Sequence, residues 1–209
     1  MTAEELIARF GPIPLWRIRV DPPPGMATEA DVIRIHDRED RTCELIDGIL
    51  IQKDMNAFSS VIEAWIGSLI GAFVRPRRLG FVLDSSEVLR LAENRLRAPD
   101  VSFIRRDQTP GGRFPREPIP DLYPTLAVEV LSPGNTKREM SEKLDDYFGA
   151  GSELVWLVDP ATRSVRVFTA RDAESTLNIG DLLDGGSALP GFSVPVAELF
   201  GVLELGEEA

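Results

Sequence analysis

Leu126-Ala127-Val128-Glu129-Val130-Leu131 has the apolar character of a buried β-strand, yet it carries a carboxylate in its middle. A second carboxylate, Asp100, follows Pro99 inside the segment 95–104, which also has the pattern of a strand. A carboxylate buried in such a strand is costly unless it is hydrogen-bonded, ion-paired or bound to a metal. Two such acids on neighbouring strands suggest one shared cause, and a divalent cation is the candidate.

The strand period places both acids among small side chains. Successive side chains of a strand point to opposite faces, so every second residue shares a face. The neighbours on these faces are Ala98 and Ser102 beside Asp100, and Thr125 and Ala127 beside Glu129. This leaves room for a ligand, and one cation can touch both acids if the strands pair. For either acid alone, a loop cap or an arginine partner such as Arg97 is the favoured interpretation, whereas the two acids together, on faces with small residues, favour the metal.

Composition limits the classes of function. The chain has 209 residues and a net charge of −11, which argues against a uniformly basic nucleic-acid-coating face but allows a local basic groove. The single cysteine, Cys43, excludes an intramolecular disulfide. The N-terminus is acidic and the apolar stretches are interrupted, so we expect no secretory leader, no membrane span and a cytoplasmic location.

Histidine chemistry is almost excluded. The only histidine, His36, lies in a polar stretch and is expected to be an ordinary exposed residue. Zinc sites with several histidines and Ser-His-Asp hydrolases need more than this sequence offers. The catalytic groups that remain are carboxylates, lysines, arginines and hydroxyls.

The chain is expected to form a proline-rich arm over residues 1–40 and one compact domain over 41–209. Asp47-Gly48 predicts a two-residue hairpin turn. Thr136 and Glu139 predict a capping box at a helix start, and Gly151 its C-terminal cap. The predicted helices cover 4–10, a segment after Thr28, 59–74, 136–150 and 196–200, and the predicted strands cover 42–46, 49–52, 81–91, 95–104, 126–131, 154–158 and 164–169.

Lysine usage gives an independent clue, because the chain has only Lys53, Lys137 and Lys143 among its 23 basic residues. Lys143 belongs to the stripe of its helix that faces the sheet. A buried ammonium there can hold or give a proton as a compact charge, although a snorkelling lysine at the core edge is equally compatible with the pattern. Lys137 is the second candidate, disfavoured because it opposes the helix dipole.

The ordered motifs resemble the Uma-two family of restriction endonuclease-like proteins, within the PD-(D/E)XK nuclease superfamily. They extend from about Thr42 to Phe200 and include Glu44-Leu45-Ile46-Asp47-Gly48, Pro99-Asp100, Ala127-Val128-Glu129-Val130-Leu131-Ser132-Pro133, Glu142-Lys143-Leu144 with Tyr147, Val155-Trp156-Leu157-Val158-Asp159-Pro160 and Leu189-Pro190-Gly191-Phe192. Each motif alone is weak, whereas the set in this order is specific.

The resemblance implies an α/β fold with a restriction-endonuclease-like mixed β-sheet flanked by helices. It implies that Asp100 and Glu129 hold Mg²⁺ or Mn²⁺, with Glu44 as a further acidic ligand, and that DNA is cleaved. The superfamily's lysine usually stands two residues after the second acid, where this chain has Leu131, so the role is expected to pass to Lys143. Without metal, the clustered acids should repel, so that one of them binds a proton more readily.

Two departures from the family are visible. Many members have a histidine at the start of the long helix, where this chain has Ser59, and residues 1–40 lie outside the pattern. Clustered arginines are candidate phosphate contacts, with an ordinary solvated surface as the alternative. They are Arg75, Arg77, Arg78, Arg105 and Arg106.

Three functions remain open at this point. The first is a metal-dependent DNA endonuclease acting through Asp100, Glu129 and Lys143. The second is a nuclease-like fold kept as a nucleic-acid or protein interaction module with weak or no cleavage. The third, another carboxylate-pair enzyme such as a glycoside hydrolase, is disfavoured because three Trp and two Tyr give little aromatic platform for a sugar. A homodimer is expected for double-strand cleavage.

Overall fold

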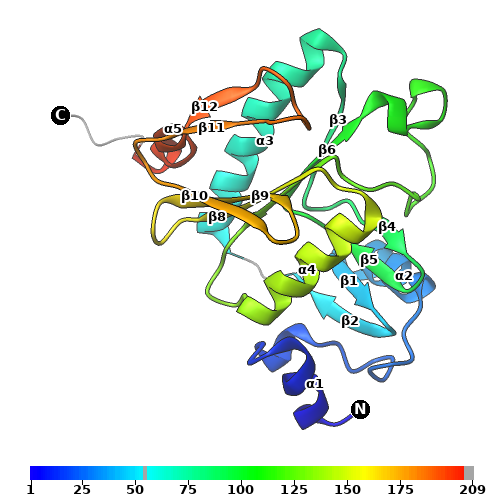
Figure 1. Ribbon diagram of the computed structural model, residues 1–209. Coiled ribbons are helices and arrows are strands. Elements are labelled where there is room, and N and C mark those ends of the chain that lie inside the picture. The colour runs from blue at the N-terminus through cyan, green and yellow to red at the C-terminus, as the bar shows by residue number, and fades with distance from the viewer. Residues whose placement is uncertain (54–55, 205–209) are drawn as a thin grey trace.

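A computed structural model describes residues 1–53 and 56–204 and contains a mixed six-stranded sheet in the order β10-β9-β8-β7-β6-β3 (Figure 1). The strands are β3 (Gly80–Asp84), β6 (Val101–Arg105), β7 (Leu126–Val130), β8 (Leu154–Asp159), β9 (Ser164–Ala170) and β10 (Ala173–Leu177). Only β7 and β8 pair in parallel, and the helix between them supplies the crossover that a parallel pair needs. The predicted mixed α/β fold is therefore confirmed.

A smaller antiparallel sheet has the order β2-β1-β5-β4. Its strands are β1 (Cys43–Ile46), β2 (Ile49–Gln52), β4 (Leu89–Ala92) and β5 (Arg95–Arg97). Asp47 and Gly48 both have positive φ, 46° and 78°, as the predicted two-residue hairpin turn requires. Helix α2 (Glu29–Glu39) packs against β1 and places Val32 and Ile35 in this second core.

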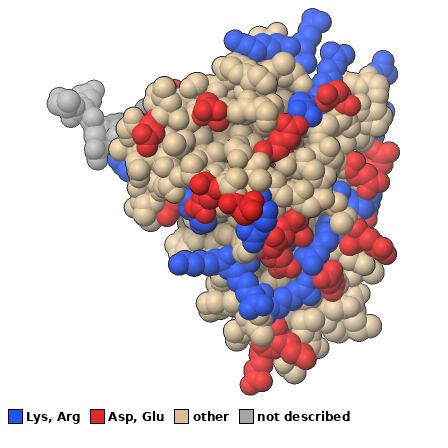
Figure 2. Space-filling view, viewed as in Figure 1, with Lys and Arg blue, Asp and Glu red and all other residues tan. Residues whose placement is uncertain are grey.

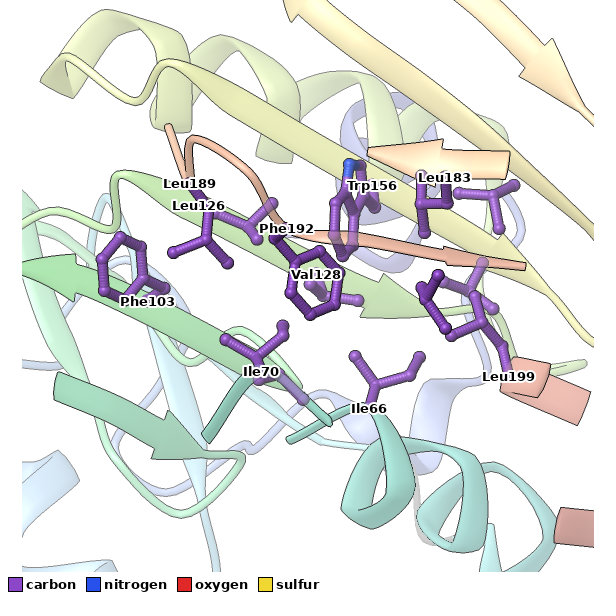
Figure 3. Packing of buried hydrophobic residues seen from close by; sticks show 14 of the residues in the cluster. Ile66, Ile70, Phe103, Leu126, Val128, Trp156, Leu183, Leu189, Phe192 and Leu199 are labelled. Carbon is purple, nitrogen blue, oxygen red and sulfur yellow. The ribbon is translucent and has the colours of Figure 1, made fainter. Parts of the chain in front are cut away.

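The main core lies between the large sheet and α3 (Ala57–Arg77), the predicted long helix, which begins after Asn56 and extends to Arg77. Its buried face meets the apolar face of β6, β7 and β8, as Figure 3 shows for Ile66, Ile70, Val128 and Trp156. The C-terminal segment closes this core, with the Phe192 ring 6.1 Å from that of Trp156. Leu126, Val128 and Val130 point into it, which leaves Glu129 on the opposite face as predicted.

Helix α3 corrects one expectation about membranes. By length and composition it passes the test for a membrane-spanning helix, and it is the one such helix in residues 1–53 and 56–204. Its residues Ile62, Ile66, Ile70 and Val74 are buried against the sheet. A core helix of a globular fold meets the same criteria, because both must be apolar over many turns.

The opposite face of the large sheet is covered by α4 (Lys137–Ala150). The predicted capping box is present, since Thr136 accepts from the Glu139 amide at 3.0 Å and Glu139 accepts from the Thr136 amide. Gly151 ends the helix with φ 112°, a left-handed conformation that suits glycine. Tyr147 and Lys143 point from this helix towards β7, because their spacing places them on its buried face.

Two of the predicted strands are wrong in length. Each of them divides into two shorter strands, which belong to different sheets. Segment 81–91 divides into β3 and β4, because the Asp84 carboxylate accepts from the Ser86 amide and hydroxyl and turns the chain. Segment 95–104 divides into β5 and β6 around Pro99, which has no amide hydrogen for a sheet ladder. Asp100 therefore lies in a bend just before β6 and not within a strand. The prediction that its side chain belongs to a strand face is wrong.

The C-terminal segment holds a two-stranded sheet that sequence patterns did not predict, β11 (Leu182–Asp184) with β12 (Ser193–Pro195). The predicted last helix is present as α5 (Val196–Gly201), followed by the short turn η4 (Val202–Glu204). The loop between β6 and β7 contains two further 3₁₀ turns, η2 (Arg106–Gln108) and η3 (Pro110–Gly112). None of these elements contains either of the two acids of the candidate site.

The N-terminal residues pack onto the hairpin and α4. Helix α1 (Ala3–Phe10) lies beside α4, and the Thr136 hydroxyl donates to the Phe10 carbonyl at 2.5 Å. The turn η1 (Leu15–Arg17) buries Arg17 to 2% exposure, and its guanidinium donates to Glu139 at 2.6 and 3.0 Å. Arg17 also donates to the Gln52 carbonyl at the end of β2. The arm thus holds β2 against the loop that precedes α4.

Candidate active site

Glu129 stands in the middle of β7 and is 3% exposed. The Lys143 ammonium donates to its Oε2 at 2.7 Å, and the Tyr147 hydroxyl donates to its Oε1. Both partners come from α4, which faces this side of the sheet. The buried carboxylate is therefore held by two donors one turn apart on a single helix, as a buried charge requires.

Asp100 reaches the same strand from the bend before β6. Its amide donates to the Val128 carbonyl at 3.0 Å, and its Oδ2 accepts from the Val130 amide at 2.7 Å. Its Oδ1 accepts from the Lys53 ammonium at 2.6 Å. The two backbone contacts flank Glu129 on β7, so the structure brings the two predicted acids together.

A cavity of about 30 Å³ joins these groups. Its ionisable lining includes Asp100, Glu129, Glu63, Lys53 and Lys143. This volume exceeds the roughly 10–15 Å³ that a single water needs. The buried Ser59 hydroxyl also lines the cavity and has no hydrogen-bond partner in residues 1–53 and 56–204. An unsatisfied buried hydroxyl beside carboxylates indicates a place where a polar ligand fits.

Glu63 is the acidic residue that sequence reasoning missed. It is the only acidic residue in α3, and it lines the cavity together with Asp100. Burial, and then the neighbouring Asp100 carboxylate, raise the pKa of Glu63 to about 7. A signal existed in the sequence, since Glu63 interrupts a helix that is otherwise apolar or small over its first five turns. Only the packing of α3 over Asp100 gives that signal a meaning.

Glu44, the third predicted metal ligand, is ion-paired with two basic side chains. Its carboxylate accepts from Arg97 at 2.8 Å and from the Ala98 amide at 3.2 Å, and it lies 3.1 Å from the Lys143 ammonium. Burial alone would raise the pKa of Glu44, but Lys143 and Arg97 outweigh it and lower the pKa to about 2. Glu44 belongs to the same network yet does not line the cavity.

The predicted lysine is placed as expected. Lys143 is 3% exposed, and although burial disfavours its charge, Glu129 and Glu44 outweigh burial and raise its pKa. It therefore stays an ammonium ion between two carboxylates. Burial raises the pKa of Glu129 too, because the attraction of Lys143 is opposed by Asp100. The expected tendency of one acid to bind a proton thus appears at Glu129 and Glu63, with burial as its main cause.

Lys53 is a second site residue that sequence patterns did not predict. It follows β2 directly and donates to Asp100 and to the Ala98 carbonyl, the latter at 2.8 Å. As the structure stands, Asp100 pairs with Lys53 and Glu129 with Lys143. Accordingly, no three His, Cys, Asp or Glu side chains among the described residues are arranged to hold one metal ion.

The donor chemistry nonetheless suits a hard divalent cation. Asp100, Glu129 and Glu63 bring carboxylate oxygens to one cavity from three different elements, and Ser59 adds an unsatisfied hydroxyl. Mg²⁺ and Mn²⁺ prefer such oxygen ligands. Each carboxylate oxygen has two lone pairs, so a hydrogen bond to lysine does not exhaust its capacity. The residues present therefore fit the implied ion in chemical type.

The mixed sheet between α3 and α4, with one acid before β6, one within β7 and a lysine on α4, defines a protein of the restriction-endonuclease-like class. The Uma2 family, described as "Putative restriction endonuclease", matches residues 29–197. The chain belongs to this family, and the family resemblance drawn from the sequence is confirmed.

A solved structure has the same fold. It is the crystal structure of a protein from Anabaena variabilis ATCC 29413, titled a putative nuclease belonging to DUF820. It is 22% identical to the chain, covers 78% of the chain and 92% of its own length, and superposes with a TM-score of 0.70. No curated protein matches the chain.

Proposed function

We propose that this protein is a nuclease that hydrolyses phosphodiester bonds of DNA with a divalent metal ion. The observation that carries the proposal is the joining of Asp100 and Glu129 at one ion-sized cavity, with Lys143 bonded to Glu129. Membership of the Uma2 family, described as "Putative restriction endonuclease", supports nuclease activity and agrees with the general use of divalent metals by that class.

In this proposal Asp100, Glu129 and Glu63 hold the ion, which is Mg²⁺ or Mn²⁺. When bound, the ion supplies Lewis-acid chemistry, which polarises a phosphoryl oxygen and lowers the pKa of water. Glu63 takes the ligand role that was expected of Glu44, because Glu63 lines the cavity and Glu44 does not. Glu44 instead pairs with the Lys143 ammonium at 3.1 Å.

The lysines complete the proposed chemistry. Lys143 stays charged and lies against Glu129, where it stabilises the negative charge that develops on the attacked phosphate. Tyr147 holds the second Glu129 oxygen and so fixes the carboxylate. Lys53 neutralises Asp100 in the state described here, and the ion and Lys53 therefore compete for this carboxylate.

Cleavage assays test this function directly. Single- and double-stranded DNA and RNA are incubated with the wild-type chain in Mg²⁺, Mn²⁺ or EDTA, beside Asp100→Asn. We expect DNA cleavage by the wild type with either metal, none in EDTA, and loss of cleavage in the variant because a neutral amide is a poor ligand for a hard cation. Equal cleavage by wild type and Asp100→Asn, or none by either, would contradict the proposal.

A second function has one observation in its favour. Lys53 and Lys143 already neutralise Asp100 and Glu129, as in a site retained for structure. The alternative is a nuclease-like module that binds nucleic acid or protein without cleavage. Nucleic-acid binding by the wild type without cleavage in either metal would favour it. The homodimer and the cytoplasmic location stay predictions, the former open to analytical ultracentrifugation.

A further inference from the structure

We propose that a groove between α3 and β3 binds a single-stranded segment of nucleic acid and leads it to the acids of the site. The inference rests on the proposed nuclease function and adds to it the form and path of the substrate. It begins from a hollow of about 690 Å³ between these two elements, which is lined by Glu63 and Asp100 at one end. The groove is therefore continuous with the candidate active site.

The groove extends to the far end of α3. A second hollow, of about 750 Å³, shares Gly71, Val82 and Leu83 with the first and ends beside Arg75 and Arg78. From Glu63 to Arg75 the helix advances by about 18 Å, at roughly 1.5 Å per residue. In B-form DNA the phosphates of one strand advance by roughly 3.4 Å along the helix axis, and an extended single strand spaces them more widely, so only a few phosphates fit along this path.

Three arginines line the far end. Arg75, Arg78 and Arg106 are exposed, and none of them has an ion pair or side-chain hydrogen bond among the described residues of the chain. Arg90 and Arg95 are paired with carboxylates, whereas the exposed Arg38, Arg116 and Arg138 also have no ion pair within residues 1–53 and 56–204 but stand on three different segments of the chain. Figure 2 shows basic side chains at the end of the molecule where α3 ends in Figure 1. In a chain of net charge −11, free guanidinium groups gathered at one groove indicate an anionic ligand.

The lining between the arginines and the acids favours a single strand. Gly67, Gly71 and Val82 give the groove small or apolar walls, beside Asp84 and serine side chains. Phe81 lines the arginine end from the edge strand β3, with its ring 5.4 Å from that of Phe114. Single strands are bound where positive charge lies beside apolar or aromatic side chains that unpaired bases can cover while the phosphates meet the cations. A duplex would keep its bases paired and would leave these apolar walls uncovered.

The test measures binding separately from cleavage. Fluorescein-labelled 20-nucleotide DNA, single-stranded or as duplex, is titrated with protein in EDTA and followed by fluorescence anisotropy. The groove variant combines Arg75→Ala, Arg78→Ala and Arg106→Ala. The matched control replaces three exposed arginines outside the groove and so has the same change of charge; these are Arg38, Arg116 and Arg138.

We expect the groove variant to bind single-stranded DNA about 10–100-fold more weakly at 0.1 M salt. The slope of the logarithm of the binding constant against the logarithm of the salt concentration should become less steep by up to about 0.7 for each lost phosphate contact. The control should stay within about threefold of the wild type, and the duplex should bind more weakly than the single strand. Equal effects of the two triple variants, tighter binding of the duplex, or no binding by the wild type would overturn the inference.

Failure of the groove and failure of the nuclease function give different results. If the groove variant loses binding while no protein cleaves DNA in Mg²⁺ or Mn²⁺, the groove stands and the nuclease proposal fails. If the wild type cleaves DNA and Asp100→Asn does not, while both triple variants bind alike, the nuclease proposal stands and the groove inference fails.

Discussion

Replacing Arg97 by alanine is expected to lower the free energy of unfolding by about 3–5 kcal/mol, the usual cost of removing one partner from a buried ion pair. Arg97 is 0% exposed, and its guanidinium donates to Glu44 at 2.8 Å and to Asp146 at 2.6 Å. Its removal leaves a fully buried and a largely buried carboxylate without their shared cation. Urea denaturation followed by tryptophan fluorescence measures the loss.

Arg95→Ala is the matched control from the same strand, β5. Arg95 is partly exposed and pairs with Glu142 at 2.7 Å and Asp47 at 3.0 Å. Ion pairs in contact with solvent contribute about 0–1 kcal/mol, so the control should lose no more than that. Similar losses in the two variants would contradict the assignment of Arg97 as the central cation of a buried network.

The same network predicts a pH dependence. The folded-state pKa of Glu44 is about 2, below its unfolded value near 4.5. An acid with a lowered folded pKa contributes stability that is present above the unfolded pKa and is lost as pH falls towards the folded one. The wild type should therefore lose stability between about pH 4.5 and 2, and Arg97→Ala, which raises the pKa of Glu44, should lose less over this range.

Local sequence patterns predicted the elements whose cause is local. The Asp47-Gly48 turn and the Thr136 capping box are confirmed, because their hydrogen bonds join residues within a few positions of each other. The strand boundaries near Ser86 and Pro99 were missed. Both breaks carry a local signal, Asp84-Ser85-Ser86-Glu87 in the first segment and Pro99-Asp100 in the second. The pairing of the two halves with different sheets shows that the strand ends at each of them.

The residues of the candidate site also fall into two groups, those that the sequence predicted and those that only the packing of distant segments brings to the site. Asp100, Glu129 and Lys143 were predicted because each contradicts its surroundings, as a charge in an apolar strand or on the buried face of a helix. Glu63 also interrupts an apolar helix, but nothing near it in the sequence indicates its partner, and Lys53 stands at a strand end where a charge is ordinary. Glu63 meets Asp100 through the packing of α3, and Lys53 meets it through the hairpin, and both contacts join distant parts of the chain.

Glu63→Gln is expected to increase stability and decrease activity. Without metal, the folded pKa of Glu63 is about 7 against an ordinary value of 4.5, because burial and Asp100 disfavour its charge. An acid with a raised folded pKa is destabilising above that pKa, and the penalty develops as pH rises from 4.5 to 7. The variant should therefore be more stable than the wild type at pH 8, by on the order of 2 kcal/mol, and equal to it below pH 4.

In Mn²⁺ the order of stability should reverse. The wild type gains stability from an ion that binds only the folded state, whereas the variant lacks a charged ligand and gains less. Thermal unfolding at pH 8 without Mn²⁺ measures the difference in stability between the two proteins, and unfolding with Mn²⁺ measures the stabilisation that the ion gives each of them. The charge-matched control is Glu198→Gln, which replaces an exposed acid on α5. Cleavage should fall roughly 10–100-fold or more in Glu63→Gln, by analogy with the loss that groups supporting a metal's ligands cause.

The pH profile separates a ligand from a merely buried acid. If Glu63 must be charged to hold the ion, wild-type cleavage at limiting Mn²⁺ rises as pH increases through about 7, and this rise is absent from the residual activity of Glu63→Gln. A buried acid with no role in the ion's binding would leave the metal-dependent gain in stability and the pH profile unchanged, although its replacement would still stabilise the metal-free protein. The stability gain without metal and its reversal in Mn²⁺ must therefore occur together, since the same negative charge destabilises the empty cavity and binds the ion.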